Sequence, residues 1–423
     1  MNLAIRTKWP TAKVGDLCDV SRGSSPRPIK DQRYFEGGTI PWIKIADATK
    51  SGKFLYETKQ YVNEYGASFS RLLPPGTILV AASGTLGYTQ ILGVQGCAHD
   101  GWLILTNLRD FDRDFAYYTL QLMERYFYNA AYGAAIQNIN TEILRETLIP
   151  HPPILTQRKI ASILSTYDDM LKNNLRRIKI LENMAQNLYR EWFVKFRFPG
   201  HEKVRMVDSQ LGEIPEGWKM ATLGDVSNII PGYAFKSKDW SENGISVIKI
   251  KNIRPENLID TEKIDHVPED ILTLKHKKYW VRHGDILIAM TGATAGKIGK
   301  LRSKRPMLLN QRVAKIDPIM PYKEYVWCSV SNPEAERGFY ALADGAAQPN
   351  MSGTQIENTK LLLPDIEVLQ KFNDLISSKI KYVDNLILSN FTLRQTRDLL
   401  LPRLISGELD VSELDIKIPE EVA

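Results

Sequence analysis

The chain has 423 residues, more than one hydrophobic core usually supports, so we expect at least two domains. Apolar residues make up 43% and charged residues 25% of the chain, a composition that argues against a disordered protein. Lysine and arginine exceed the acids by 55 to 49, and the resulting net charge of +6 permits an anionic partner without requiring one.

Residues 1–153 consist mainly of short β-branched or alternating stretches bounded by Gly, Pro, Ser or Asn. Such stretches predict strands joined by turns, with a few helices such as residues 115–127. A Gly/Pro-rich loop at residues 22–35 (RGSSPRPIKDQRYF) is dense in hydrogen-bond donors. We expect a mixed α/β domain that carries a loop suited to sequence reading, although an ordinary surface loop is the alternative.

The periodicity becomes helical from Thr156 onward. Positions spaced alternately by four and three residues then form one stripe, nine of whose ten members are apolar: Ile160, Leu164, Tyr167, Leu171, Asn174, Ile178, Leu181, Ala185, Leu188 and Trp192. This pattern predicts a coiled-coil seam on a helix about 60 Å long, at 1.5 Å per residue.

Beyond the helix, the first domain is repeated. Trp9, Gly15, Asp16 and Gly23 recur 209 residues later as Trp218, Gly224, Asp225 and Gly232. Longer matches follow in the same order, namely residues 40–47 with 245–252, 75–87 with 283–296, 133–138 with 345–350, and 148–150 with 362–364. We therefore predict a second mixed α/β domain of the same fold.

A second helical stripe begins near Val368. It comprises Phe372, Ile376, Lys379, Val383, Leu386, Asn390, Leu393, Arg397, Leu400 and Leu404. Each stripe contains one asparagine, Asn174 or Asn390, which either fixes the register of a buried seam or faces solvent at a frayed contact. The sequence leaves both alternatives open.

Connectivity predicts how the helices pair. Only residues 196–217 separate the first helix from the second domain, so this domain should follow at the far end of the helix, and the second helix should run back antiparallel. The expected fold class is α/β: two mixed α/β domains separated by two long helices that form an antiparallel coiled coil, with an internal pseudo-twofold repeat. The predicted boundaries are 1–153, 154–200, 201–365, 366–410 and a tail at 411–423.

Motifs for catalysis and metal binding are missing from the sequence. Residues 291–300 (TGATAGKIGK) resemble a phosphate-binding loop. Such a loop has four residues between its first glycine and the GK pair, followed by Ser or Thr, whereas here only three residues intervene and Ile298 follows the pair. The histidines form no HExxH pattern, and neither GxSxG nor GxGxxG occurs. Cys18, Cys97 and Cys328 lie far apart, which suits a reducing compartment. We expect a cytoplasmic protein without an active site, a metal or a membrane span.

Basic residues cluster in residues 274–315, where eleven lysines and arginines face a single acid, Asp285. Tyr279, Trp280, Asn310 and Gln311 are interleaved with them, which favours DNA over an ordinary solvated face. The complete set of predicted DNA contacts is Arg22, Ser24, Ser25, Arg27, Lys30, Lys44, Thr85, Gln137, Asn138, Lys236, Lys249, Lys251, Lys297, Lys300, Arg302, Asn310, Gln311, Arg312, Gln348 and Asn350.

The chain resembles the specificity subunits of type I restriction-modification systems along nearly its full length. The resemblance is carried by RGSSPRP and YFEGGTIPWIKIADAT near the start, by residues 156–193 after the first domain, by LGEIPEGWKMATLGDV at 211–226, and by LLLPRLISGELDV at 399–411. It implies two target-recognition domains separated by helical spacers, with no catalytic site of their own.

The resemblance also implies partners. These are double-stranded DNA, modification subunits that bring S-adenosylmethionine and methylate adenine, and restriction subunits that use ATP and Mg²⁺ to translocate and cleave DNA. None of these cofactors is expected on this chain, and no membrane is expected as a partner. Matched turn residues differ between the copies, since Thr85 opposes Ala293 and Ile136 opposes Gln348. This divergence predicts two different half-sites, and the resemblance then implies an asymmetric bipartite target with an unread spacer. Major-groove reading from one face favours half-sites about 10 bp apart.

Two alternatives are consistent with the same sequence. One is a coiled-coil scaffold that bridges proteins without touching DNA, against which the basic 274–315 segment argues. The other is a specificity chain from a related system whose partner fuses methylation and cleavage, which the neighbouring genes would reveal.

Overall fold

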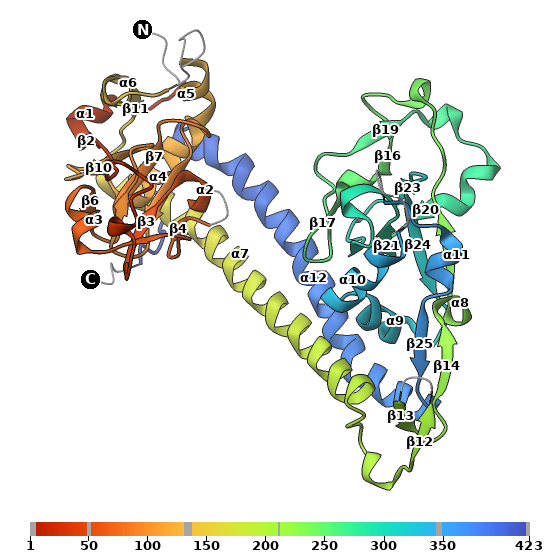
Figure 1. Ribbon diagram of the computed structural model, residues 1–423. Coiled ribbons are helices and arrows are strands. Elements are labelled where there is room, and N and C mark those ends of the chain that lie inside the picture. Colours follow the sequence, from red (N-terminus) through yellow and green to blue (C-terminus); the bar gives the residue numbers. More distant parts are fainter. Residues whose placement is uncertain (1–5, 49–51, 131–137, 210–211, 344–348, 420–423) are drawn as a thin grey trace. The chain divides into compact units, whose positions relative to one another are not determined.

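The computed structural model describes residues 6–48, 52–130, 138–209, 212–343 and 349–419. They form two compact units, Met1–Asn173 with Phe391–Ala423 and Asn174–Asn390 (Figure 1). Each unit contains one α/β domain, called head 1 or head 2 below, together with one half of each long helix.

Head 1 is built on two main sheets. The first has the strand order β2-β10-β7-β8-β4 and the second β5-β3-β9-β6. The strands are β2 (Asp19–Arg22), β10 (Trp102–Thr106), β7 (Ile78–Ala81), β8 (Thr89–Leu92), β4 (Phe54–Leu55), β5 (Tyr61–Val62), β3 (Ile40–Ile43), β9 (Gly96–Ala98) and β6 (Arg71–Leu73), with a separate pair of β1 (Thr11–Lys13) and β11 (Leu148–Pro150). The helices are α1 (Val14–Leu17), α2 (Ile45–Ala48), α3 (Glu64–Ser68), α4 (Arg113–Leu122), α5 (Glu124–Ala130) and α6 (Thr141–Glu146).

Head 2 repeats this topology except for β4, which has no counterpart in its first sheet; its sheets are ordered β15-β24-β21-β22 and β19-β16-β23-β20. Its strands are β15 (Ser227–Pro231), β24 (Val313–Pro318), β21 (Ile286–Ala289), β22 (Ile298–Lys300), β19 (Asp265–Val267), β16 (Ile245–Ile248), β23 (Met307–Leu309) and β20 (Trp280–Val281), with three pairs: β14 (Lys219–Thr222) and β25 (Lys360–Leu363), β12 (Met206–Ser209) and β13 (Gly212–Pro215), and β17 (Ile253–Arg254) and β18 (Leu258–Ile259). The helices are α8 (Leu223–Val226), α9 (Lys323–Val330), α10 (Pro333–Leu342) and α11 (Gly353–Glu357). The sequence repeat is therefore a repeat of fold.

Local sequence explains the matched elements. The strands β7 (ILVA) and β21 (ILIA) are buried at every position, as continuous apolar runs are when both faces of a sheet are covered. Side chains also cap helices in both heads, since Asp112 accepts a hydrogen bond from the Phe115 amide at α4, and Asn332 caps α10 directly before Pro333.

The long helices are α7 (Ile154–Tyr189), which continues into a π-type turn at Arg190–Val194, and α12 (Ile366–Ile405). In the first unit, Ile160 and Leu164 share a core with Leu401 and Leu404. In the second unit, Ile178 packs with Val383 and Leu386, and the ring of Trp192 lies 5.9 Å from that of Phe372. Within each unit, later positions on α7 meet earlier positions on α12. The predicted antiparallel coiled coil and the α/β fold class are thus confirmed.

The predicted seams match the packing. None of the predicted seam residues on α7 or α12 is exposed. Asn174 Nδ2 donates a hydrogen bond to Asn390 Oδ1 at 2.8 Å, and Asn390 is only 3% exposed. The asparagines therefore form an amide pair in the seam, buried at Asn390 and half-buried at Asn174, which can fix the helix register, and the frayed alternative is wrong.

Candidate nucleic-acid interface

In head 1, the loop after β2 lies directly on the turn between β9 and β10. The Gly23 amide donates to the Trp102 carbonyl at 2.9 Å, and the Ser24 amide donates to the Ala98 carbonyl at 3.1 Å. A Cβ on Gly23 would come within 2.2 Å of the His99 carbonyl oxygen, so glycine alone permits this approach. The loop is thus held on a rigid turn, as a recognition surface requires.

Three predicted cations of this loop reach the surface. Arg22, Arg27 and Lys30 are exposed. Arg22 Nε donates to the Asp100 carbonyl at 2.8 Å, and the Arg27 guanidinium pairs with the Asp100 carboxylate. Because solvent screens such exposed contacts, these cations remain available to a nucleic-acid partner.

The two predicted serines have structural partners. Ser24 Oγ donates to the Phe69 carbonyl at 3.2 Å, and Ser25 Oγ accepts from the Asp100 amide at 3.2 Å. Both residues are half-buried. They therefore shape the loop, whatever they contact on a partner.

An aromatic patch adjoins the loop. The rings of Tyr34, Tyr65 and Phe69 pack with centroids 5.1 to 5.5 Å apart, and Tyr65 and Phe69 are exposed. Arg33, exposed and paired with Asp31 at 2.7 Å, belongs to the same surface. Exposed rings beside cations can pack against sugars and bases while the cations meet phosphates.

Head 2 has the same close approach at the equivalent place. A Cβ on Gly232 would lie 2.3 Å from the Asn310 carbonyl oxygen, and the Gln311 amide donates to the Tyr233 carbonyl at 2.9 Å. The turn that carries Asn310, Gln311 and Arg312 thus takes the place of the β9–β10 turn. Asn310 is half-buried, whereas Gln311 and Arg312 are exposed.

A lysine-rich turn lies beside this surface. Leu274–Tyr279 form a 3-10 helix in which Lys275, Lys277 and Lys278 are exposed. Lys275 Nζ lies 5.4 Å from the ring of Tyr233, and the turn borders an open hollow of about 500 Å³. The sequence marked this segment as basic but did not single out its lysines as contacts.

Other predicted lysines lie on aromatic rings. Lys249 Nζ stands 3.2 Å from the ring centroid of Trp240 and 2.8 Å from Asp265, which also pairs with Lys251. In head 1, Lys44 lies 4.5 Å over the ring of Trp42. Lys236 is exposed.

Each head also has a glycine turn that meets a segment distant in sequence. In head 1, the Ile139 amide donates to the Ala82 carbonyl at 2.9 Å, which brings the turn of Thr85 close to Asn138. In head 2, Thr291 bridges to Asn350. At the end of the head 2 turn, half-buried Lys297 accepts a backbone hydrogen bond from the Ala289 amide. The predicted contacts Gln137 and Gln348 lie outside the described residues.

The glycines at the two ends of each turn have left-handed backbone angles, although the head 2 turn is one residue longer. Gly84 and Gly87 have φ of +72° and +78°, and Gly292 and Gly296 have +71° and +81°. Such angles favour glycine, which explains why the turns kept their glycines while other residues diverged.

Two predicted contacts are corrected by the structure. The side chains of Lys300 and Arg302 are 2% and 5% exposed. Lys300 Nζ lies 3.2 Å and Arg302 Nε 3.0 Å from the Asp384 carboxylate of α12, and Arg302 also faces Glu182 of α7 at 3.6 Å. In this arrangement they cannot reach a phosphate; they bind head 2 to the helices of its own unit.

Burial dominates the electrostatics of this cluster, which we call the Asp384 cluster (Lys300, Arg302, Asp384 and Glu182). It lowers the pKa of Lys300, although nearby Asp384 opposes the shift. It raises the pKa of Glu182, which Arg302 opposes. Sequence reasoning missed the cluster because a lysine or arginine in a basic segment looks the same whether its acid partner is near or far along the chain.

Head 1 has a different polar anchor on the helices of its unit. Lys53, with a nearly buried side chain, binds Asp114 at 3.0 Å and Ser165 Oγ at 2.8 Å. Asp168 on α7 accepts from Tyr118 at 2.5 Å and from Arg397 at 2.6 Å. Both heads are therefore tied to helix residues by buried charges.

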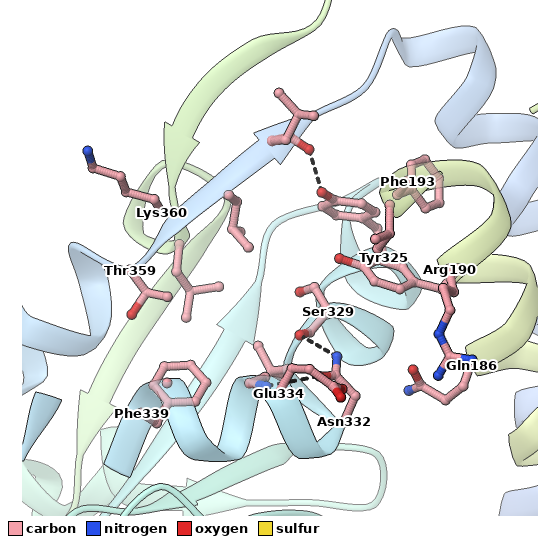
Figure 2. A pocket seen from close by; sticks show the side chains of 18 of the residues that line it. Gln186, Arg190, Phe193, Tyr325, Ser329, Asn332, Glu334, Phe339, Thr359 and Lys360 are labelled. Atoms are coloured by element: carbon pink, nitrogen blue, oxygen red, sulfur yellow. Dashed lines mark hydrogen bonds between the residues drawn. The ribbon is translucent and has the colours of Figure 1, made fainter. Parts of the chain in front are cut away.

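A hollow of about 780 Å³ in the second unit is lined by residues other than those of the basic surface (Figure 2). Its walls come from the end of α7, from α9 and α10, and from β25. Phe193, Tyr325 and Phe339 supply apolar surface, while Arg190 and Lys360 bring cations. This mixture suits a protein partner better than DNA.

Within the described ranges, no group of three or more His, Cys, Asp or Glu side chains is placed to hold a metal ion. Likewise, within those ranges no helix combines the length and hydropathy that a membrane span needs.

Known proteins resemble this chain over nearly its whole length. The MjaIX type I restriction enzyme specificity subunit of Methanocaldococcus jannaschii is 27% identical, over 96% of this chain and 94% of its own. The MjaVIII specificity subunit of the same organism is 25% identical, over 98% and 96%. A crystal structure of a type I restriction-modification S subunit from M. genitalium shares the fold, with a TM-score of 0.60 at 17% identity, covering 96% of this chain and 99% of that one.

The family model for the type I restriction modification DNA specificity domain matches residues 6–183 and 215–395. The two matches include both heads and most of both long helices. The chain therefore belongs to the type I restriction-modification DNA specificity family.

Proposed function

We propose that the chain reads a bipartite, asymmetric DNA target, one half-site with each head, and leaves the spacer between them unread. The observation that carries this proposal is one scaffold with two different reading surfaces. Apart from the additional strand β4 in head 1, the two main sheets have the same strand order in both heads, yet the matched turns present His99 and Asp100 in head 1 and Asn310 and Gln311 in head 2. Different donors and acceptors on equal frames would select different bases.

Affinity would come mainly from phosphates. Head 1 offers Arg22 and Lys30 as exposed cations, and head 2 offers cations on four segments, namely Lys236, Lys251, Lys275, Lys277, Lys278 and Arg312. Each lysine or arginine that neutralises a phosphate releases counterions and steepens the salt dependence of binding.

The helices would dock modification subunits. Coiled-coil helices normally keep polar outer faces, yet Leu155, Met170 and Leu399 are exposed in the first unit. In the second unit Leu175, Ile180, Met184, Leu375 and Tyr382 are exposed on the same two helices, and the hollow of Figure 2 adds apolar surface at the base of head 2. Exposed apolar residues at this density mark a protein interface.

In the proposed complex this chain has no catalytic role. Modification subunits would supply S-adenosylmethionine and adenine methylation, and restriction subunits would supply ATP- and Mg²⁺-dependent translocation and cleavage. The cytoplasm, where these substrates and the chromosome meet, is the proposed location. The three buried cysteines suit that reducing compartment.

A gel-shift titration, with and without the modification subunit, tests the proposal. We expect sequence-specific binding by the complex, with affinity that falls steeply as salt rises. A flat salt response, or a complex that assembles but retards no DNA, would favour the protein-bridging scaffold instead.

A further inference from the structure

We infer that Arg27 reads a guanine in the half-site bound by head 1, and that Asp100 is the residue that positions it. The inference rests on the proposed DNA-binding function and adds the identity of one base. Asp100 was not among the residues that the sequence singled out.

Arg27 is fixed at both ends although it projects into solvent. Its carbonyl accepts a hydrogen bond from the hydroxyl of buried Tyr34 at 2.8 Å, and its Nη2 donates to Asp100 Oδ2. The side chain is nevertheless 68% exposed. A long side chain that is already held in one rotamer loses less conformational entropy when it binds, so Arg27 is preorganised for a contact.

Asp100 is itself held firmly. Its amide donates to Ser25 Oγ at 3.2 Å, and its carbonyl accepts from Arg22 Nε at 2.8 Å. It lies on the turn that leads to fully buried Trp102. The carboxylate therefore gives Arg27 a partner whose position the core of head 1 determines.

Neither stability nor phosphate binding explains this pair well. An exposed ion pair contributes little to folding, because solvent screens it. A carboxylate in a cationic face repels phosphates and partly neutralises the arginine. Holding the guanidinium in one orientation gives the acid a role, since the parallel N–H donors of arginine match O6 and N7 of guanine.

A second arginine of the same loop shows the contrast. Arg33 is also exposed and acid-paired, but its Nε and Nη2 both donate to the Asp31 carboxylate, at 2.7 to 3.1 Å. In that pairing Asp31 occupies both donors on the Nε–Nη2 edge of the Arg33 guanidinium. Arg27 engages Asp100 through Nη2, and among the described residues its Nε and Nη1 have no hydrogen-bond partner. Arg33 is thus a matched control for charge and exposure.

Head 2 presents other chemistry at the equivalent turn. Asn310 and Gln311 carry amides, which pair with adenine rather than guanine in the major groove. The guanine contact is accordingly assigned to head 1 alone.

The test uses the assembled complex with modification subunits and a random duplex library, so that no target need be known beforehand. Bound sequences are selected with the wild type and with Arg27→Ala, Arg27→Lys, Asp100→Asn and Arg33→Ala. We expect a guanine in one wild-type half-site and roughly 5- to 150-fold weaker discrimination at that position alone for Arg27→Ala. Arg27→Lys keeps the positive charge but lacks the parallel N–H donors of the guanidinium, so it should not restore the preference for guanine.

Asp100→Asn should weaken the same guanine preference, and adding it to Arg27→Ala should have no further effect, because it acts through Arg27. Arg33→Ala should leave every base preference unchanged. Replacing the selected guanine by 7-deazaguanine should cost the wild type affinity but not the Arg27→Ala complex, a readout independent of how well each variant folds.

The outcomes separate the inference from the proposed function. A wild-type complex that selects no motif and binds DNA without salt dependence contradicts DNA recognition itself. A selected motif whose guanines are all insensitive to Arg27→Ala overturns the guanine contact alone, as does an equal loss of affinity for every sequence in Arg27→Ala and Arg33→Ala. An intact preference in Asp100→Asn refutes the positioning role.

Discussion

Removing Asp384 should destabilise the second unit strongly without weakening the attraction to DNA. Asp384 accepts contacts from Lys300 at 3.2 Å and Arg302 at 3.0 Å, and both cations are almost fully buried. Asp384→Ala leaves them without this carboxylate, and only Glu182 remains near Arg302. Breaking a buried pair by deleting one partner costs about 3–5 kcal/mol of unfolding free energy.

Urea unfolding followed by tryptophan fluorescence measures this loss, since the ring of Trp327 lies 5.3 Å from Lys300 Nζ. With a denaturant slope near 3 kcal/mol per molar, the midpoint of the unfolding transition should fall by roughly 1–1.7 M urea. The matched control is the triple variant Lys300→Met, Arg302→Met, Asp384→Leu, which removes all three buried charges. It should be as stable as the wild type, or about 1–4 kcal/mol more stable.

The triple variant also separates the structural role from DNA contact. If Lys300 and Arg302 bound phosphates, their loss would reduce the slope of log K against log salt by about 1.8. The buried geometry predicts an unchanged slope. A folded triple variant with the reduced slope, or an Asp384→Ala chain as stable as the wild type, would refute the reasoning.

Three further substitutions test other parts of the account. Asn390→Leu should cost about 0.5–1.5 kcal/mol by leaving the half-buried Asn174 amide without its partner, and calorimetry should show recovery when Asn174→Leu is added. Burial lowers the pKa of His99 below its ordinary value of 6.5. As the pH drops through 6.5, this histidine is therefore protonated in the unfolded chain before it is protonated in the folded chain, and the stability of the folded chain falls. His99→Asn should then lose less stability than the wild type between about pH 7.5 and pH 5; equal losses would contradict the shift. Leu399→Lys, on a side chain 70% exposed, should reduce co-purification of modification subunits without changing the melting temperature.

Much of the architecture could be predicted from periodicity and repetition. The alternating stripe from Ile160 to Trp192 requires a helix whose one face is buried, and connectivity leaves an antiparallel partner as the simplest solution. Gly23 and Gly232 were visible as repeated residues, and the structure supplies their reason, a backbone approach that excludes a Cβ.

Contacts between distant segments could not be predicted. Lys300 and Arg302 lie in a basic run, and only folding reveals that Asp384, more than 80 residues later, neutralises them. Asp100 was missed because an acidic residue beside a histidine does not indicate nucleic-acid binding in a sequence. Only the fold shows that it contacts Arg27. Pairing partners depend on three-dimensional distance, which composition and spacing do not encode.

The central claim is that each head reads one half of a bipartite target. The most direct measurement is genome-wide mapping of methylated adenines in cells whose only copy of this chain carries a foreign head in place of residues 1–153. The account predicts a motif in which one half changes while the other half is retained. A motif altered in both halves, or unchanged in both, would contradict it.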